Sequence, residues 1–235
     1  KNETALKILS AEEIIHKSIA VSGGDSFGKS EIFFGFRDKT YMSKRLGNAF
    51  LLVRMFEQNK DSITDVYDNS GFRRMVGEEF VHIADSMAKK YTASVNSVHY
   101  FSTLPFGLND TAVNKTLIGE EKIKDKDYYK IKVTFNQEGG GEDYEDVFVY
   151  WVNKQNFKSD YIAYSYNEDD GVGMRFREAY NERYVTGLRF VDYNNYKAED
   201  ASIQLYDLGK AFESNQLKLL SKIELKNVKV VLIDN

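Results

Sequence analysis

Three histidines could take part in chemistry, because imidazole serves as acid, base or metal ligand near neutral pH. His16, His82 and His99 lack the spacing of a metal site, and no Gly-x-Ser-x-Gly nucleophile motif accompanies them. His99, beside Tyr100, is the one to consider for catalysis, although a core or capping histidine is the favoured interpretation. Paired carboxylates carry no information in a chain with 36 acidic residues. We therefore predict no catalytic residue and no metal ligand.

Two glycine-containing segments could be taken for ligand loops. Gly139-Gly140-Gly141 could cradle a phosphate with backbone N–H groups, but no phosphate-loop pattern follows, and flanking acids would repel an anion. A wide hairpin turn is favoured there. Glu168 to Gly171 fails as a calcium loop, because Tyr166 and Arg177 would stand where carboxylates are needed, and it predicts a hairpin instead. Weak calcium binding by residues 142–146 is the alternative; we predict no cofactor.

Arginines on apolar strand faces are better candidates for binding. Arg54 shares its predicted strand face with Phe50, Leu52 and Phe56, and Arg175 lies on a strand whose other face is apolar. A guanidinium in such a place can hold a carboxylate or phosphate through two hydrogen bonds. The alternative, which is favoured, is an internal salt bridge or an arginine whose head reaches solvent.

Aromatic residues make up 14% of the chain, and some strands carry them on both faces. The segment from Asp146 to Asn153 is apolar on both faces, so both must be covered. Such strands suit a protein with an apolar pocket, which is the usual form of a small-molecule site. A thick core explains the pattern equally well. If a pocket exists, we expect its lining to include Tyr100, Phe101, Trp151 and Tyr164, with Arg54 or Arg175 holding a headgroup.

The elements that carry these residues are mostly strands. Ser10 to Glu13 has the spacing of a capping box, and helical periodicity follows it as far as Gly23-Gly24. Apolar residues alternate with a period of two from about Lys29, whereas residues 83–104 return to helical spacing. Further strands fill the remainder, the last of them over Lys222 to Ile233, apart from a short helix near residues 207–213.

Roughly nine to eleven consecutive strands and two substantial helices follow from these patterns. No alternation of strand and helix occurs that would build a parallel sheet. The sequence therefore predicts a mainly β (α+β) fold with a large antiparallel sheet. We expect a tail or tether over residues 1–9 and a single domain over residues 10–235.

The overall composition excludes several classes of protein. Net charge is −4 with acids and bases interleaved, which argues against a nucleic-acid partner. The chain has no cysteine, so disulfides and thiolate metal sites are excluded. No apolar run approaches the roughly 18–20 residues that span a bilayer. The chain begins at Lys1, and a removed export signal or an engineered start would each explain this.

Four features together resemble a family of uncharacterised secreted proteins and lipoproteins of Bacteroidota. They are the opening helix that ends at Gly23-Gly24 and the stretches Asn96 to Pro105, Val133 to Gly141 and Tyr150-Trp151. The resemblance covers residues 10 to 196 and implies no established activity. It does imply a lipidated cysteine just before Lys1, with the tail as tether.

More loosely, the order of helix, strands, helix, strands is similar to that of the bacterial lipoprotein-localisation factors. That resemblance implies an antiparallel sheet curved into a half-open barrel, with two helices on its concave side over an apolar cavity that carries acyl chains. It transfers no individual residue and is a fold analogy.

The sequence and the resemblance together favour a non-enzymatic protein of the cell envelope, periplasmic or at the surface, that binds a lipid or an apolar small molecule. It would meet the membrane only through an anchor before Lys1. One alternative is a hydrolase that uses His99 with an acid in the same cavity. Another is a structural envelope protein that binds a protein partner.

Overall fold

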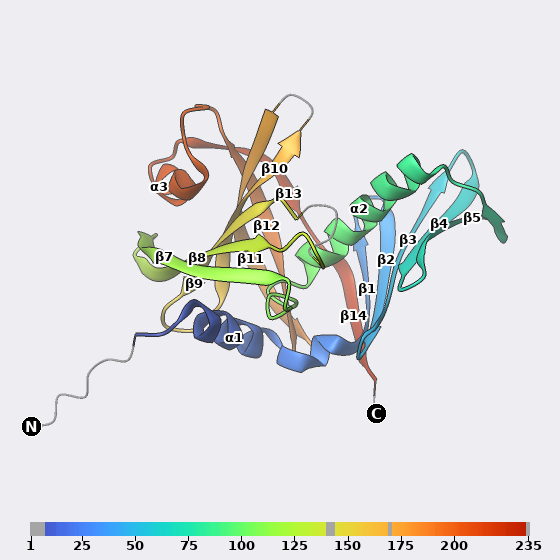
Figure 1. Cartoon of the computed structure of the whole chain (residues 1–235), viewed down its shortest axis with the longest axis horizontal. Coiled ribbons are helices and arrows are strands. Elements are labelled where there is room, and N and C mark those ends of the chain that lie inside the picture. The colour runs from blue at the N-terminus through green and yellow to red at the C-terminus, as the bar shows by residue number, and fades with distance from the viewer. Residues whose placement is uncertain (1–7, 140–143, 169–170, 234–235) are drawn as a thin grey trace, which may run out of the picture. The chain divides into compact units, whose positions relative to one another are not determined.

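The computed structural model describes residues 8–139, 144–168 and 171–233 (Figure 1). Its helices are the α-helices α1 (Ala11–Ser22), α2 (Asp85–Ser102) and α3 (Leu208–Glu213) and the 3-10 helices η1 (Gly24–Gly28) and η2 (Leu205–Asp207). Parts of the predicted tail and loops lie outside the described residues, namely residues 1–7, Gly140-Gly141, residues 142–143 and Asp169-Asp170.

The strands form two antiparallel sheets in which nearly every strand pairs with its neighbour in sequence. The first sheet has the spatial order β14 (Lys226–Leu232), β1 (Lys29–Phe36), β2 (Lys39–Leu46), β3 (Ala49–Gln58), β4 (Asp61–Asp68), β5 (Gly71–Val76) and β6 (Glu79–Val81). The second has the order β13 (Leu217–Ile223), β12 (Leu188–Ala198), β11 (Gly171–Val185), β10 (Ser159–Glu168), β9 (Val147–Asn153), β8 (Lys126–Phe135) and β7 (Val113–Ile123).

This architecture confirms the predicted mainly β, antiparallel fold class. The helix predicted over 83–104 is α2, and the short helix predicted near 207–213 is α3. Strands outnumber the prediction because β4, β6 and β7 were not foreseen, and because the last predicted strand covers part of β13 together with β14. None of the helices in the described residues combines the length and the apolar character needed to cross a membrane.

Two compact units divide the chain. The α3 unit comprises Lys1–Val21, Gly107–Glu178 and Tyr196–Leu220, and the α2 unit comprises Ser22–Phe106, Ala179–Asn195 and Ser221–Asn235. The whole first sheet and α2 belong to the α2 unit, whereas α3 and the strands β7 to β10 belong to the α3 unit. The single domain expected over residues 10–235 stays a prediction.

Helix α1 begins at the capping box expected from the sequence. The backbone N–H of Glu13 donates to Ser10 Oγ (3.2 Å), and the backbone N–H of Ser10 donates to Glu13 Oε2 (2.9 Å). These bonds satisfy N–H groups that the first helical turn leaves without partners. The helix ends before Gly23, whose φ of 127° and close approach to Leu188 suit only glycine.

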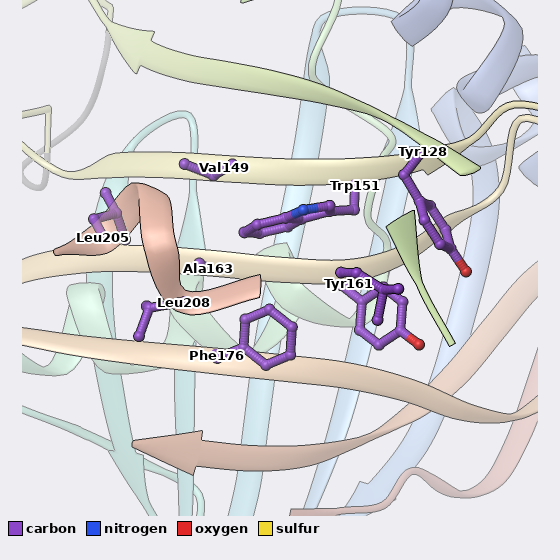
Figure 2. Packing of buried hydrophobic residues seen from close by; sticks show 9 residues of the cluster. Tyr128, Val149, Trp151, Tyr161, Ala163, Phe176, Leu205 and Leu208 are labelled. Carbon is purple, nitrogen blue, oxygen red and sulfur yellow. The ribbon is translucent and has the colours of Figure 1, made fainter. Parts of the chain in front are cut away.

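Each unit has its own apolar core. In the α2 unit, Phe27, Phe34, Tyr41, Leu188 and Phe190 belong to one buried cluster. In the α3 unit, Trp151, Tyr161 and Phe176 from β9, β10 and β11 pack under α3 and η2, as Figure 2 shows. The cores account for most of the aromatic residues that are fully buried.

Candidate ligand-binding site

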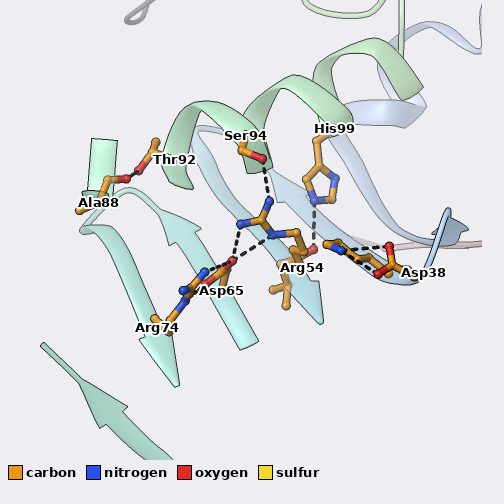
Figure 3. Close-up of polar contacts among 10 residues, drawn as sticks. Asp38, Arg54, Asp65, Arg74, Ala88, Thr92, Ser94 and His99 are labelled. Atoms are coloured by element: carbon orange, nitrogen blue, oxygen red, sulfur yellow. Dashed lines mark hydrogen bonds and ion pairs between the residues drawn. The ribbon is translucent and has the colours of Figure 1, made fainter. Parts of the chain in front are cut away.

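A row of charged side chains crosses the first sheet on the side that α2 covers (Figure 3). Arg54 on β3 lies directly opposite Asp65 on β4, and Asp65 lies directly opposite Arg74 on β5. Directly paired residues of antiparallel strands point to the same face, so the register alone brings the three side chains together. We call these three residues the arginine row.

Asp65 accepts hydrogen bonds from both guanidinium groups. Its Oδ2 lies 2.9 Å from Nε and 2.6 Å from Nη2 of Arg54, and 3.0 Å from Nη2 of Arg74. Its Oδ1 lies 2.6 Å from Nε of Arg74. The side chains are deeply buried, with exposed fractions of 7% for Arg54, 0% for Asp65 and 10% for Arg74. Hydrogen bonding to Asp65 raises the pKa of Arg74, so Arg74 stays charged.

Helix α2 completes the surroundings of the row with neutral groups. Ser94 Oγ accepts a hydrogen bond of 2.7 Å from Nη1 of Arg54, and the Tyr91 ring centroid lies 3.8 Å from the Arg74 guanidinium carbon. Ser94 is itself exposed, so the part of the Arg54 guanidinium that contacts α2 lies next to solvent. The row is therefore buried against the sheet and bordered by solvent at α2.

His99 lies on the same side of α2 but is built as a core residue. Its Nε2 lies 3.1 Å from the Val53 carbonyl oxygen, and its ring packs edge-on against Phe34 and Tyr41. Burial lowers the pKa of His99 to about 3. Nδ1 has no hydrogen-bond partner in the described part of the chain. The imidazole is thus neutral at physiological pH and far from the pKa near 7 that suits a general base.

Aromatic rings border the arginine row without being fully covered. Phe50 and Tyr67 meet edge to face with ring centroids 5.2 Å apart, and Phe72 lies 5.8 Å from Tyr91. The Phe56 ring lies 5.6 Å from the guanidinium carbon of Arg54 and 5.9 Å from that of Arg74. All five rings are half-buried, and we call them the aromatic margin.

Three of the predicted site residues lie in the α2 unit. Arg54 is in the arginine row. It forms a salt bridge with Asp65, which is the alternative that the sequence analysis favoured for this arginine. Tyr100 and Phe101 directly follow His99 on α2, half-buried, with ring centroids 5.6 Å apart. Since successive helical residues turn by about 100°, Phe101 points away from the side of α2 that contacts the sheet through His99. Tyr100 and Phe101 are therefore placed together but outside the arginine row.

The other three predicted residues lie in the α3 unit and divide between the two faces of the second sheet. Trp151 pairs with Tyr161, is fully buried and faces α3. Tyr164 pairs with Phe148 and points to the opposite face, together with Arg175, its partner on β11. Trp151 and Tyr164 therefore do not line one surface, because an odd and an even position of these strands face opposite ways.

The sequence did not single out Asp65, Arg74 and Tyr91. Arg74 belongs to a short strand, and Asp65 to a strand that the sequence did not predict. Both become neighbours of Arg54 only through the pairing of β3 with β4 and β5. The single signal was the position of Asp65 between Ile63 and Tyr67 on one strand face, where a charged residue needs a partner. Among the described residues, no group of three or more His, Asp or Glu could hold a metal ion.

Solved structures define the class of fold. The chain shares its fold with a LolA superfamily protein from Nitrosomonas europaea, with a TM-score of 0.51 at 12% identity over 97% of this chain and 95% of that chain. A DUF1329 family protein from Desulfovibrio piger gives 0.42 at 11% identity over 94% and 93% of the two chains. A domain from Vibrio parahaemolyticus, described as that of an outer membrane lipoprotein-sorting protein, gives 0.44 at 11% identity over 86% and 97%.

The fold of the chain, built of antiparallel sheet and helices, is thus similar to that of the LolA superfamily protein, as the looser resemblance implied. The chain belongs to DUF6503, a family of unknown function that matches residues 6–225. No curated protein matches the chain. The origin in Bacteroidota stays a prediction.

Proposed function

We propose that this protein is a non-enzymatic binding protein of the cell envelope, and that it holds a lipid or another hydrophobic ligand against the aromatic margin. The observation that carries the proposal is the incomplete burial of all five rings, Phe50, Phe56, Tyr67, Phe72 and Tyr91. An acyl chain laid over such rings gains about 0.8 kcal/mol for each methylene group removed from water. Binding of this kind needs no catalytic group.

The fold supports the same class of function by analogy. The lipoprotein-localisation factors, which the order of elements resembles, carry acyl chains, and the LolA superfamily protein shares this fold. The periplasmic or surface location, with an anchor before Lys1, rests on the same analogy. Tyr100 and Phe101 on α2, and Tyr164 with Arg175 in the α3 unit, remain proposed ligand contacts.

The enzyme alternative has less support. A hydrolase that used His99 would need an acid beside it, whereas Phe34, Tyr41 and the Val53 carbonyl surround the ring. Its low pKa comes first from burial and not from a catalytic partner. We therefore keep His99 as a core residue in the proposal.

The first experiment is native mass spectrometry of protein purified without detergent, followed by solvent extraction. A lipid that co-purifies, or uptake of an added fatty acid, supports the proposal. A clean mass that stays unchanged with added fatty acid or phospholipid contradicts it and favours the structural alternative.

A pair of phenylalanine variants locates the binding surface. Phe72→Ala removes a ring of the aromatic margin, so we expect weaker binding of a fluorescent fatty acid. Phe80→Ala is the matched control, because Phe80 pairs with Met75 on the opposite face of the sheet and is 67% exposed. Equal binding by both variants and the parent would show that the ligand lies elsewhere.

A further inference from the structure

We propose that the ligand is an acyl amphiphile with a negatively charged headgroup, and that the guanidinium groups of Arg54 and Arg74 bind this headgroup. The inference rests on the proposed function, since it names the kind of lipid that the aromatic margin takes. It commits to a lipid headgroup as the source of the anion.

The charges of the arginine row do not balance. Arg54 and Arg74 contribute two positive charges, and Asp65 is the one carboxylate that pairs with either of them within the described residues. All three side chains are at least nine-tenths buried. A buried charge without a counter-charge is unfavourable, so one more negative charge beside the row would stabilise it.

Asp65 cannot satisfy both arginines fully. Its two oxygens already accept four hydrogen bonds from Nε and Nη2 of the two guanidinium groups. Nη1 of Arg54 donates to the neutral hydroxyl of Ser94, and Arg74 uses Nε and Nη2, but not Nη1, for its hydrogen bonds to Asp65. These outer amino groups are donors that an incoming carboxylate or phosphate oxygen can use.

A third arginine adds to the positive charge on this side of the sheet. Arg45 lies on the same face of β2 as Tyr41, which pairs directly with Arg54. It donates a hydrogen bond of 3.0 Å to Ser43, and no carboxylate among the described residues pairs with it. Burial lowers its pKa to about 10, so it remains charged at neutral pH. Both Arg45 and Arg54 contribute to the lowered pKa of His99, which places that ring within the field of both arginines.

Helix α2 supplies no compensating charge. Its one acidic residue is Asp85, at its first position, and no carboxylate stands among Tyr91, Ser94 and His99 on its sheet side. The covering helix and the sheet thus enclose a positive, aromatic surface, although the whole chain has a net charge of −4. A free inorganic anion would leave the aromatic rings uncovered, whereas an anionic amphiphile matches the row with its head and the margin with its chain.

The test compares laurate with dodecanol, which share an alkyl chain length and differ in headgroup charge. Binding of each to the full chain is measured by native mass spectrometry and by displacement of a fluorescent fatty acid. We expect laurate to bind at least about tenfold more tightly, the discrimination that one charge-assisted hydrogen bond supplies.

Variants on neighbouring residues assign the effect to the row. Arg74→Gln should remove most of the preference for laurate and leave dodecanol binding nearly unchanged. Arg73→Gln is the matched control, because Arg73 is adjacent in sequence, faces the other side of β5 and pairs with Asp68. It should keep the full preference.

Failure of this inference differs from failure of the proposed function. Equal binding of laurate and dodecanol by the parent protein overturns the anionic headgroup and leaves lipid binding intact. Binding of neither compound overturns the proposed function itself. The comparison on the parent protein needs no variant, so a folding defect of Arg74→Gln would not prevent a decision.

Discussion

Arg54 and Asp65 face each other directly across β3 and β4, with Nη2 of the arginine 2.6 Å from Oδ2 of the aspartate. A slip of one residue in this pairing would move Asp65 to the other face of the sheet and leave the buried Arg54 without its carboxylate. The ion pair therefore favours one register for the two strands. The same register sets the distance from Asp65 to Arg74 and thus assembles the candidate site.

Removal of the Asp65 charge should destabilise the protein strongly. Asp65→Asn keeps the shape of the side chain but leaves two buried guanidinium groups without a counter-charge. We expect a loss of about 3–5 kcal/mol in the free energy of unfolding, measured by urea denaturation. Asp68→Asn is the control, because the pair of Asp68 with Arg73 is much more exposed and should contribute less than about 1 kcal/mol. Equal losses in the two variants would contradict the assigned role of the row.

Local patterns were sufficient for much of the fold. The alternation in β1, the capping box at Ser10 and the helix before Pro105 each depend on residues close in sequence, and each was predicted. Strand β7 was missed because it lies at a sheet edge, where most of its residues are exposed and few are apolar. Residues 222–233 were predicted as one strand, yet Glu224-Leu225 separates β13 from β14, which belong to different sheets. No glycine or proline lies at that break.

The candidate site was predictable only in part, because its members meet through strand pairing. Arg54 stood out from the sequence, since it interrupts an apolar strand face. Asp65 on β4 and Arg74 on β5 become its neighbours through the register of strand pairing, which cannot be read from composition. The two-faced apolar strand around Trp151 was identified, but a periodicity of two does not show which face packs under a helix.

His99 should make the protein less stable in mild acid. Its folded pKa of about 3 lies below the value of about 6.5 of an unfolded histidine, so the unfolded chain binds one more proton between these values. The free energy of unfolding should therefore fall as pH decreases from about 6.5 towards 3, with a slope from this residue of up to about 1.4 kcal/mol per pH unit. Urea denaturation at several pH values measures it.

The comparison with His99→Gln isolates this contribution from that of the carboxylates. The variant should lose stability at neutral pH, but its free energy of unfolding should fall less steeply between pH values of about 6 and 4 than that of the parent. His82→Gln, at an exposed position of the same unit, should keep the parent slope. Parallel curves for the parent and His99→Gln would show that His99 is not buried in neutral form.

Gly209 should tolerate no side chain, because α3 lies directly on Trp151. A Cβ at this position would clash with Oε1 of Glu121 and would lie 2.9 Å from Cζ2 of Trp151. Glu121 is held by its ion pair with Lys130 (2.8 Å) and Trp151 is fully buried, so neither neighbour can move freely. We expect Gly209→Ala to cost about 1–3 kcal/mol and to shift the fluorescence of Trp151 to longer wavelength as α3 is displaced. Trp151 is the only tryptophan in the sequence, so the emission reports on this place alone.

Gly28→Ala is the control, since a Cβ there would make ordinary contacts of 3.8 and 3.9 Å with Phe106. Unchanged emission and stability in Gly209→Ala would mean that α3 does not pack closely on Trp151.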